Sequence, residues 1–447
     1  MTNFGKKAET KLSDINTNPS DTVTGTPKYQ LSALATDQLT LGEVIGQLVW
    51  IKRRQIMREV AVIGIGQTKF GRFPEIRAEQ LAQEAVGAAL KDSGIPAKDI
   101  QVAYTARSRQ ASTDSQIILK SFGIVDREMI NVQNACAGGS TAVHCLWKDI
   151  AYGIYDLGIA IGVEDMNYPK DHPISQQQGK ALSGSGAGAA EDLEATMGRT
   201  MPALFAMIAR RQMDVYGATR EDFAQVAVKS HRHACLNPYS QFQKELTLEE
   251  VLSSRMISDP ITLYQCCPVS DGAAAVILCS MDIARQYSSR PVRILGSALL
   301  SGDYSFRAED MTILDVNIKT AEKAYKMAGV DPKDLDVVEM HDAFAPEEIM
   351  HYEELGLCKR GEGAALLRSG ATALGGRVPV NPSGGLISLG HPLSASGVRV
   401  VVDIARQLRG QAGNMQVPNA KMGLAQMQGG AVTGLRAAAC GIQILAI

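Results

Sequence analysis

The sequence has almost no net charge. Its 447 residues hold 45 Lys and Arg against 47 Asp and Glu, a formal net charge of −2, and the longest run of like charges is Lys52–Arg54. A protein that binds nucleic acid through phosphate contacts carries a basic surface, so this class is not supported. Any anionic ligand has to be met by a few local Lys or Arg side chains.

Paired cysteines and long apolar segments are also missing. None of the eight cysteines forms a Cys-x-x-Cys pair and two are adjacent, Cys266 and Cys267, which indicates reduced thiols rather than a disulfide framework. The apolar run near the start, Leu48–Ile51, is far shorter than the roughly 20 residues of a membrane span, and no signal-peptide pattern precedes it. We therefore expect a cytoplasmic protein without a membrane span.

The first 56 residues differ from the rest of the chain. Residues 1–28 contain almost no large apolar side chains and are expected to be mobile, whereas the apolar spacing over residues 38–56 favours a helix. The codons of Lys52–Arg54 can resemble a ribosome-binding site just before Met57. This suggests the hypothesis that Met57 is the natural start and that residues 1–56 are not native; the alternative is a native, mobile extension.

Beyond Met57 the sequence repeats itself. Residues Ala89–Val102 are echoed by Ala324–Val337, and each copy reads as a helix, a Gly stop, a short Pro-containing turn and a strand. Each copy follows its own apolar strand, Val60–Gly64 or Val292–Gly296. The alternation of strands and helices predicts an α/β protein built from two duplicated halves, residues 57–289 and 290–447.

The first half carries an insertion at about residues 167–237. Its early part, residues 183–190, consists of Ser, Gly and Ala, which predicts a flexible loop, and its later part, Pro202–Met213, is predicted to be a helix. Long loops over a site commonly bind ligand or cover it. We therefore expect a lid.

Cys136 is the candidate nucleophile. The strand around Ile130–Val132 runs into a corner of small residues and then into a helix, which places Cys136 at a helix N-terminus. The positive end of the helix dipole favours the thiolate, and small neighbours let a bulky substrate reach the sulfur. The alternative is a buried structural thiol, which is a common role of free cysteine.

Two histidines are candidate acid–base groups. Aligning the helices that follow the two small-residue corners places His391 within about one residue of the position equivalent to Cys136, where it could accept the thiol proton. His341, beside Asp342, lies at the end of the repeated strand, where open α/β folds gather their sites. Each histidine taken alone could equally serve packing or lie on the surface.

A metal site has weaker support. His231, His233 and Cys235 alternate along the chain and could line one face of a strand, but no fourth ligand with suitable spacing follows. We expect no metal in this chain.

Five motifs together resemble those of the thiolase family across about residues 57–440. They are Asn134–Ser140 (Asn-Ala-Cys-Ala-Gly-Gly-Ser), Ser270–Ala275, His341–Phe344 (His-Asp-Ala-Phe), Asn381–Gly385 and Gly390–Pro392. Each motif alone is weak, but five in the family's order and spacing are specific. The His-Asp-Ala-Phe form is similar to the branch with the sterol-carrier-protein-linked thiolases and the archaeal and bacterial thiolases that work with a small partner subunit.

The resemblance implies a thiolase-like, layered α-β-α-β-α fold and acyl transfer to and from coenzyme A through an acyl-cysteine. Cys136 would be acylated, His391 would be its base and then an oxyanion donor, and His341 would bind the enolate or thioester oxygen. The Cys136 amide and the Gly429-Gly430 loop would form a second oxyanion hole. Binding roles are implied as well for three further motif residues, Asp342, Phe344 and Ser383.

One departure concerns the second cysteine that the usual thiolase has near its C-terminus, which moves the proton at the substrate α-carbon. Here Met427 or a neighbour takes its place, and the His-Asp motif, where some relatives carry that cysteine, has Ala343. Cys440 lies too far along the final strand to substitute. Either His341 moves the proton or the chemistry differs from ordinary thiolysis.

Three functions remain open. The first is cleavage of a 3-oxoacyl-CoA by CoA, or the reverse Claisen condensation, with an acyl group that can be bulky or aromatic, as in benzoylsuccinyl-CoA. The second is a retro-aldolase or another acyltransferase on the same scaffold, and the third is a non-catalytic subunit that binds acyl-CoA or lipid. By resemblance, the chain forms a homodimer or a dimer of dimers and pairs with a small zinc-ribbon and OB-fold subunit.

Overall fold

The computed structural model describes residues 57–108, 113–167, 200–287, 291–303, 310–431 and 437–447. The extension 1–56, the Ser/Gly/Ala segment 183–190 and the half boundary at residue 290 lie outside these ranges, so the predictions for them stay predictions. No described helix has the length and apolar character needed to span a membrane.

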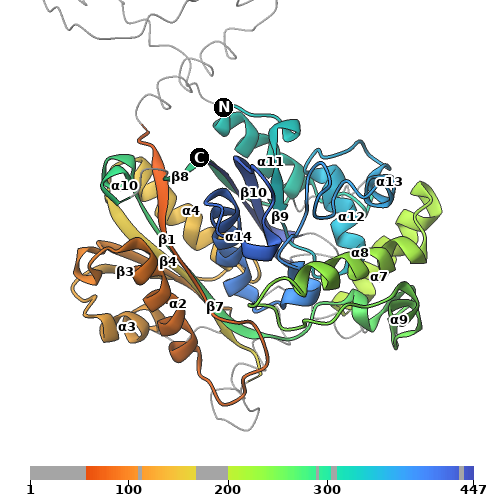
Figure 1. The fold of residues 1–447 in the computed structure, drawn as a ribbon, viewed down its shortest axis with the longest axis horizontal. Helices are drawn as coiled ribbons and strands as arrows, with labels where there is room; N and C mark the ends of the chain where they lie inside the picture. The colour runs from red at the N-terminus through yellow and green to blue at the C-terminus, as the bar shows by residue number, and fades with distance from the viewer. Residues whose placement is uncertain (1–56, 109–112, 168–199, 288–290, 304–309, 432–436) are drawn as a thin grey trace, which may run out of the picture. The chain divides into compact units, whose positions relative to one another are not determined.

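The described strands form one sheet of nine strands and a separate two-stranded ribbon (Figure 1). The sheet has the order β3-β2-β4-β7-β1-β8-β11-β10-β9, and the ribbon pairs β5 with β6. The strands are β1 Val60–Gln67, β2 Val102–Ala106, β3 Glu128–Val132, β4 Leu157–Asp165, β5 Met256–Ser258, β6 Ile261–Thr262, β7 Asp271–Ser280, β8 Val292–Ser301, β9 Val337–Glu339, β10 Met422–Ala431 and β11 Ala437–Ala446.

The sheet consists of two similar halves. In the first half β2 and β4 run parallel while β7 and β1 follow antiparallel, and in the second half β9 and β10 run parallel while β11 and β8 follow antiparallel. Strands β1 and β8, the two strands that the sequence repeat predicts, pair with each other and join the halves. This arrangement confirms the predicted α/β fold with duplicated halves.

The repeated segments have the predicted local structure. Helix α2 (Ala78–Ser93) stops at Gly94, with φ of 69°, and a turn leads into β2. Helix α11 (Asp315–Ala328) stops in the same way at Gly329, with φ of 72°, before β9. Glycine suits both stops because other residues rarely adopt a positive φ.

The remaining α-helices cover the sheet and carry the loops. They are α3 Asp114–Leu119, α4 Gly138–Ala151, α7 Met201–Tyr216, α8 Arg220–Ala234, α9 Leu248–Ser253, α10 Met281–Tyr287, α12 Ala345–Glu354, α13 Gly363–Arg368 and α14 Leu393–Leu408. Helix α7 confirms the helix predicted over Pro202–Met213 in the insertion. Helix α8 corrects the strand considered for residues 231–235, because His231 and His233 lie in its last turn.

Helices α4 and α14 pack against each other at the centre of the fold and contact strands of both halves (Figure 1). They approach so closely that two glycines are required. A Cβ on Gly139 would lie 2.2 Å from the Ser394 carbonyl oxygen, and one on Gly397 would lie 2.5 Å from the Ser140 nitrogen. This crossing brings the N-terminal ends of the two helices together, one from each half.

Candidate active site

Cys136 lies on a strained turn between β3 and α4. Ala135 has φ of 48°, a conformation that costs a non-glycine residue of order 1–3 kcal/mol and is common at functional sites. Two hydrogen bonds close the turn, from the Ala137 amide to the Asn134 carbonyl (3.0 Å) and from the Gly138 amide to the Ala135 carbonyl (2.9 Å). The turn leaves Cys136 half-buried at the positive end of α4.

His391 contacts the Cys136 thiol directly. Its Nε2 lies 3.2 Å from the sulfur, and its backbone N–H donates to the Ser270 hydroxyl (3.0 Å). The imidazole is buried just before the first turn of α14. The structure thus brings together the two residues that the alignment of the halves predicted to face each other.

Ser396 determines which nitrogen of His391 carries the proton. The Ser396 hydroxyl donates to the Pro392 carbonyl (3.0 Å), so its oxygen accepts from His391 Nδ1 at 2.9 Å. A neutral imidazole with its proton on Nδ1 has a free lone pair on Nε2. That lone pair points at the Cys136 thiol, as a general base requires.

The surroundings also keep His391 uncharged. Burial and the neighbouring charge on His341 hold the pKa of His391 well below its usual value. At neutral pH the imidazole is therefore uncharged, with its unprotonated Nε2 facing the thiol.

His341 is the second histidine of the site, and its imidazole is charged where that of His391 is neutral. Its ring meets that of His391 edge to face, with centroids 5.2 Å apart, and its ligand nitrogen lies within 4.8 Å of the Cys136 sulfur. Its Nδ1 donates to Glu347 Oε1 at 2.9 Å, while its buried Nε2 has no hydrogen-bond partner among the described residues.

Glu347 accounts for the charge on His341. Burial lowers the pKa of His341, but the Glu347 carboxylate and then the Cys136 sulfur raise the pKa by more than burial lowers it, to about 9. At neutral pH His341 is an imidazolium whose Nε2–H faces the thiol. Sequence reasoning missed both Glu347 and Ser396; each lies within six residues of its histidine in the sequence, on the helix that follows.

Gly429 packs against the turn that carries Cys136. A Cβ at this position would lie 2.2 Å from the Ala137 nitrogen and 2.7 Å from the Cys136 nitrogen. Gly430 follows with φ of 72°. The absence of side chains therefore lets the end of β10 lie directly beside the Cys136 amide.

The other three predicted residues contact the protein interior. Asp342 Oδ1 accepts from the Leu386 amide (2.6 Å), and the Ser383 hydroxyl donates to Glu339 (2.7 Å). The Phe344 ring stacks on Phe205 of the insertion, with centroids 4.6 Å apart. These contacts shape the loops around the thiol, and the binding roles that the resemblance implies stay predictions.

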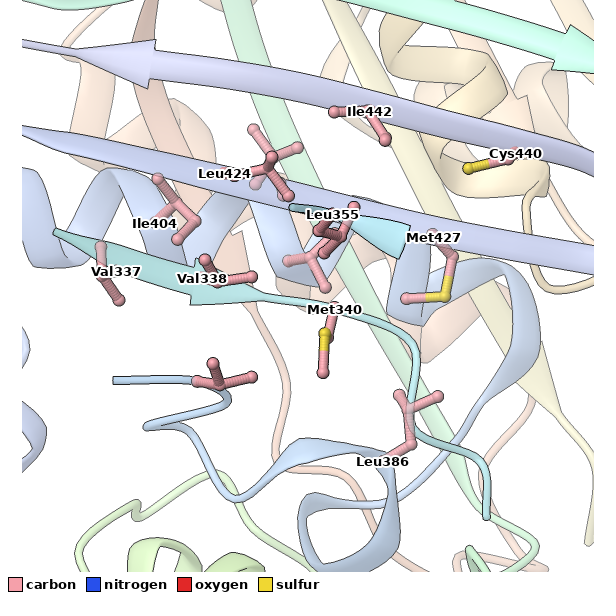
Figure 2. Packing of buried hydrophobic residues seen from close by; sticks show 14 of the residues in the cluster. Val337, Val338, Met340, Leu355, Leu386, Ile404, Leu424, Met427, Cys440 and Ile442 are labelled. Atoms are coloured by element: carbon pink, nitrogen blue, oxygen red, sulfur yellow. The ribbon is translucent and has the colours of Figure 1, made fainter. Parts of the chain in front are cut away.

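No thiol occupies the position of the second thiolase cysteine. Met427 is fully buried in β10, and Figure 2 shows its side chain in the apolar cluster that also contains Met340 and Leu386. Cys440 is also buried, opposite Gln428 on β11. The polar neighbours of Met427 on β10 are Gln426, which accepts from the His341 amide at 2.9 Å, and Gln428, whose Nε2 donates to Glu347.

The metal hypothesis for His231, His233 and Cys235 receives no support from the helix. His231 Nδ1 contacts the Lys244 carbonyl at 3.0 Å. In His233 both ring nitrogens are engaged, with the Asn381 carbonyl (2.9 Å) and the Leu374 amide (3.1 Å). Residues two apart in a helix point about 200° apart, so the set cannot share a ligand face.

Family comparisons agree with this geometry. The family described as "Thiolase, N-terminal domain" matches residues 60–282, and "Thiolase C-terminal domain-like" matches residues 298–438. Among solved structures, one named "Ltp2-ChsH2(DUF35) aldolase" is similar with a TM-score of 0.74 and 28% identity, covering 88% of this chain and 98% of that chain.

Two curated relatives match over most of their length. The benzoylsuccinyl-CoA thiolase subunit BbsB of Thauera aromatica is 38% identical over 380 residues, 84% of this chain and 96% of that protein. An acetyl-CoA acetyltransferase of Methanothermobacter thermautotrophicus is 39% identical over 380 residues, 84% of this chain and 97% of that protein. With both domain families matched in order and the cysteine–histidine pair in place, the chain belongs to the thiolase family.

Proposed function

We propose that this chain cleaves a 3-oxoacyl-CoA with CoA, or runs the reverse condensation, through an acyl group held on Cys136. The observation that carries the proposal is the 3.2 Å contact between the Cys136 sulfur and the unprotonated Nε2 of His391. A thiol needs such a base to become a nucleophile at neutral pH.

In the first half-reaction His391 accepts the Cys136 proton, and the sulfur attacks the 3-oxo carbon of the substrate. The tetrahedral intermediate then breaks the bond between C2 and C3. The acyl group stays on the sulfur, and the electron pair leaves as the enolate of an acyl-CoA, which takes up a proton at C2.

Oxyanions form on the substrate at two points, and the site offers donors for each. The Nε2–H of charged His341 lies beside the sulfur and suits the enolate oxygen. The Cys136 amide and the glycines at the end of β10 suit the oxygen of the acyl-cysteine. Such preorganised donors are commonly the largest contribution to catalysis of acyl transfer.

In the second half-reaction the thiol of CoA attacks the acyl-cysteine. The new thioester leaves, and the Cys136 sulfur takes back its proton from His391. CoA is therefore a co-substrate, as it is for thiolases.

A retro-aldolase on this scaffold is the second candidate, because a similar solved structure is named an aldolase. Aldol cleavage needs no acylated nucleophile. The complete Cys136–His391–Ser396 arrangement therefore favours acyl transfer.

The names of the relatives bear on which acyl group the substrate carries. The two relatives are named for an acetyl group and for a benzoylsuccinyl group, so we propose that a panel from acetoacetyl-CoA to benzoylsuccinyl-CoA contains the substrate. The Phe205–Phe344 stack joins the insertion to the His-Asp motif.

We further propose that the chain forms a homodimer through β3. This strand is at the edge of the sheet, and its apolar side chains Met129, Ile130 and Val132 are only half-buried. Unpaired edge strands favour pairing with a second chain. Pairing there would also brace the Cys136 turn, which begins two residues after β3.

One relative is named as a subunit, and the similar solved structure carries DUF35 in its name. We therefore propose a small second subunit as well, with zinc-ribbon and OB-fold domains. All eight cysteines are free, which supports a reducing, cytoplasmic location.

The test is intact-mass spectrometry after mixing the protein with acetyl-CoA or a longer acyl-CoA. We expect one acyl adduct, mapped to Cys136 by peptide analysis, and acetoacetyl-CoA or benzoylsuccinyl-CoA cleavage that depends on CoA. Cys136→Ala should lose both, whereas Cys145→Ala, which removes a half-buried thiol from α4, should keep the adduct. The absence of an adduct with every acyl-CoA, or release of an aldehyde from a 3-hydroxyacyl-CoA, would refute the proposal.

A further inference from the structure

A row of buried ionisable side chains stands directly behind His341. Helix α12 carries Glu347, His351 and Glu354 at spacings of four and three residues, which places them on one face. All three are buried. Their contacts continue the chain that begins at the His341 ring.

Glu347 is the centre of this row. Its Oε1 accepts from His341 Nδ1 at 2.9 Å and from the Gln428 side chain, and its Oε2 accepts from the Ala343 amide at 2.9 Å. The His351 Nε2 lies 3.5 Å from Oε1 on the far side. A carboxylate with this many donors is stabilised in its ionised form.

The far end of the row is equally well bonded. His351 Nδ1 donates to Glu354 Oε2 at 2.6 Å, and Glu354 also accepts from the Leu314 amide (2.6 Å) and the Asn317 side chain (2.8 Å). Asn317 in turn donates to Gln428 Oε1 at 2.7 Å, which closes a ring back to Glu347.

The four ionisable groups therefore alternate in charge. Burial raises the pKa of Glu347, but His341 and His351 lower the pKa by more than burial raises it, to about 2. Burial lowers the pKa of His351, but Glu354 and Glu347 raise it to about 10. Two imidazolium ions and two carboxylates leave no net charge in the interior, which makes their burial tolerable.

We propose that Glu347, supported by His351 and Glu354, is a positioning residue that holds the proton of His341 on Nδ1 and aims a charged Nε2–H at the substrate beside Cys136. The inference rests on the proposed function, since it assigns the proton that the enolate needs. His341 then transfers the proton at the substrate α-carbon, the role of the cysteine that is missing from β10.

The proton balance of the cleavage is complete on these groups. When the bond between C2 and C3 breaks, the enolate carbon C2 takes the proton from His341 Nε2, and His341 becomes neutral with its Nδ1–H still bonded to Glu347. In the second half-reaction the proton of the CoA thiol returns to His341 while His391 reprotonates Cys136. The enzyme ends in its starting state.

Few other groups among the described residues could supply this proton. Met427 and Ala343, at the positions where relatives carry a thiol, have no acidic proton. The other ionisable groups that act on the two site histidines or on Glu347 are Cys136, Cys267 and Arg399. Cys136 is the acylated residue during this step, and Arg399 is paired with Glu339. Cys267 donates its backbone N–H to the Ala343 carbonyl at 2.8 Å, and burial keeps its thiol protonated by raising its pKa well above the usual value. Cys267→Ala therefore tests this alternative, and it should leave the cleavage rate unchanged if His341 supplies the proton.

The test compares Glu347→Gln with Glu348→Gln. Both changes remove one buried carboxylate from neighbouring positions of α12, but Glu348 pairs with Lys229 at 2.5 Å instead of with His341. The ionisation of His341 is followed by nitrogen-15 NMR of labelled histidine, with the signal assigned from a His341→Asn sample among the seven histidines. This measurement needs no substrate.

We expect His341 to titrate near pH 9 in the wild type and in Glu348→Gln, and at or below 6.5 in Glu347→Gln. In that variant the Glu347 carboxylate, the largest contribution that opposes burial, is gone, and only the Cys136 sulfur still raises the pKa. In cleavage assays at pH 8 this shift makes kcat about 30-fold lower for Glu347→Gln, because little imidazolium remains. KM should change little, and Glu347→Asp should restore part of kcat. Acylation of Cys136 by acetyl-CoA is the second half-reaction in reverse, in which His341 gives its proton to the leaving CoA thiol, so it should slow in the same variant.

Two outcomes overturn the inference while leaving the proposed function intact. One is wild-type protein that forms the acyl-cysteine but has His341 titrating at or below 6.5. The other is Glu347→Gln with an unchanged titration and pH profile. If Glu347→Gln does not fold, the wild-type titration still decides. Wild-type protein that shows no acyl-cysteine while His341 titrates near 9 would refute only the proposed function.

Discussion

The crossing of α4 and α14 predicts a large effect of one added methyl group at Gly139. In Gly139→Ala the new Cβ would lie 2.2 Å from the Ser394 carbonyl oxygen and 2.6 Å from the Val398 nitrogen. Both atoms belong to the α14 backbone, so no side-chain rotation can relieve the overlap. The helices have to separate by about 1 Å to reach ordinary contact distance.

Two consequences follow from that separation. Overpacking costs about 1–3 kcal/mol, and the better helix propensity of alanine offsets up to about 1 kcal/mol of it, so the free energy of unfolding should fall by up to about 2 kcal/mol. The ends of the same helices hold the Cys136–His391 contact of 3.2 Å. A misplacement of about 1 Å there costs on the order of 100-fold in kcat.

Urea unfolding gives the stability, and the rate of Cys136 alkylation by iodoacetamide, read by peptide mass spectrometry, reports the thiol–imidazole contact without any substrate. Gly87→Ala is the matched control, because a Cβ there meets nothing closer than 3.7 Å in α2; it should raise stability by about 0.5–1 kcal/mol and leave alkylation unchanged. If Gly139→Ala matches the wild type in stability, alkylation and turnover, the central crossing does not position the pair.

Two further predictions concern buried charges. Arg399→Met should lower the free energy of unfolding by about 3–5 kcal/mol in urea titrations, because it leaves Glu339, now paired at 2.5 Å, as an uncompensated buried carboxylate; a loss below 1 kcal/mol would contradict this. The pKa values of His341 and His351 are raised to about 9 and 10, so their stabilisation is fully present below pH 6.5 and is lost as pH rises through 9 to 10. Between pH 8 and 10.5 the free energy of unfolding should therefore fall, by roughly 4 kcal/mol at most, whereas an unchanged urea midpoint would show that the two imidazoles are not charged in the folded protein.

The repeat was predictable because its signals are local. A helix that stops at Gly94 or Gly329 needs a residue that tolerates positive φ, and the turns after each stop have similar sequences. Comparing the halves then placed Cys136 and His391 at equivalent corners, in agreement with their 3.2 Å contact.

Local patterns also misled at one place. His231, His233 and Cys235 alternate as in a strand, but the segment belongs to α8, which begins with a Thr219 capping box. The N-terminal capping signal lies more than ten residues before the histidines, so a short alternating pattern could not identify the helix.

Sequence alone determined the duplicated α/β fold, the candidate nucleophile and the two histidines. The order of the motifs and the signals for helices and turns are local properties of the sequence. Tertiary structure decided the protonation of those histidines. Ser396 orients His391, and Glu347, held by Gln428 from a strand 81 residues away, holds the charge on His341. The physical reason is that a pKa depends on burial and on charges brought near in space, and neither can be read from the identity of the histidine itself.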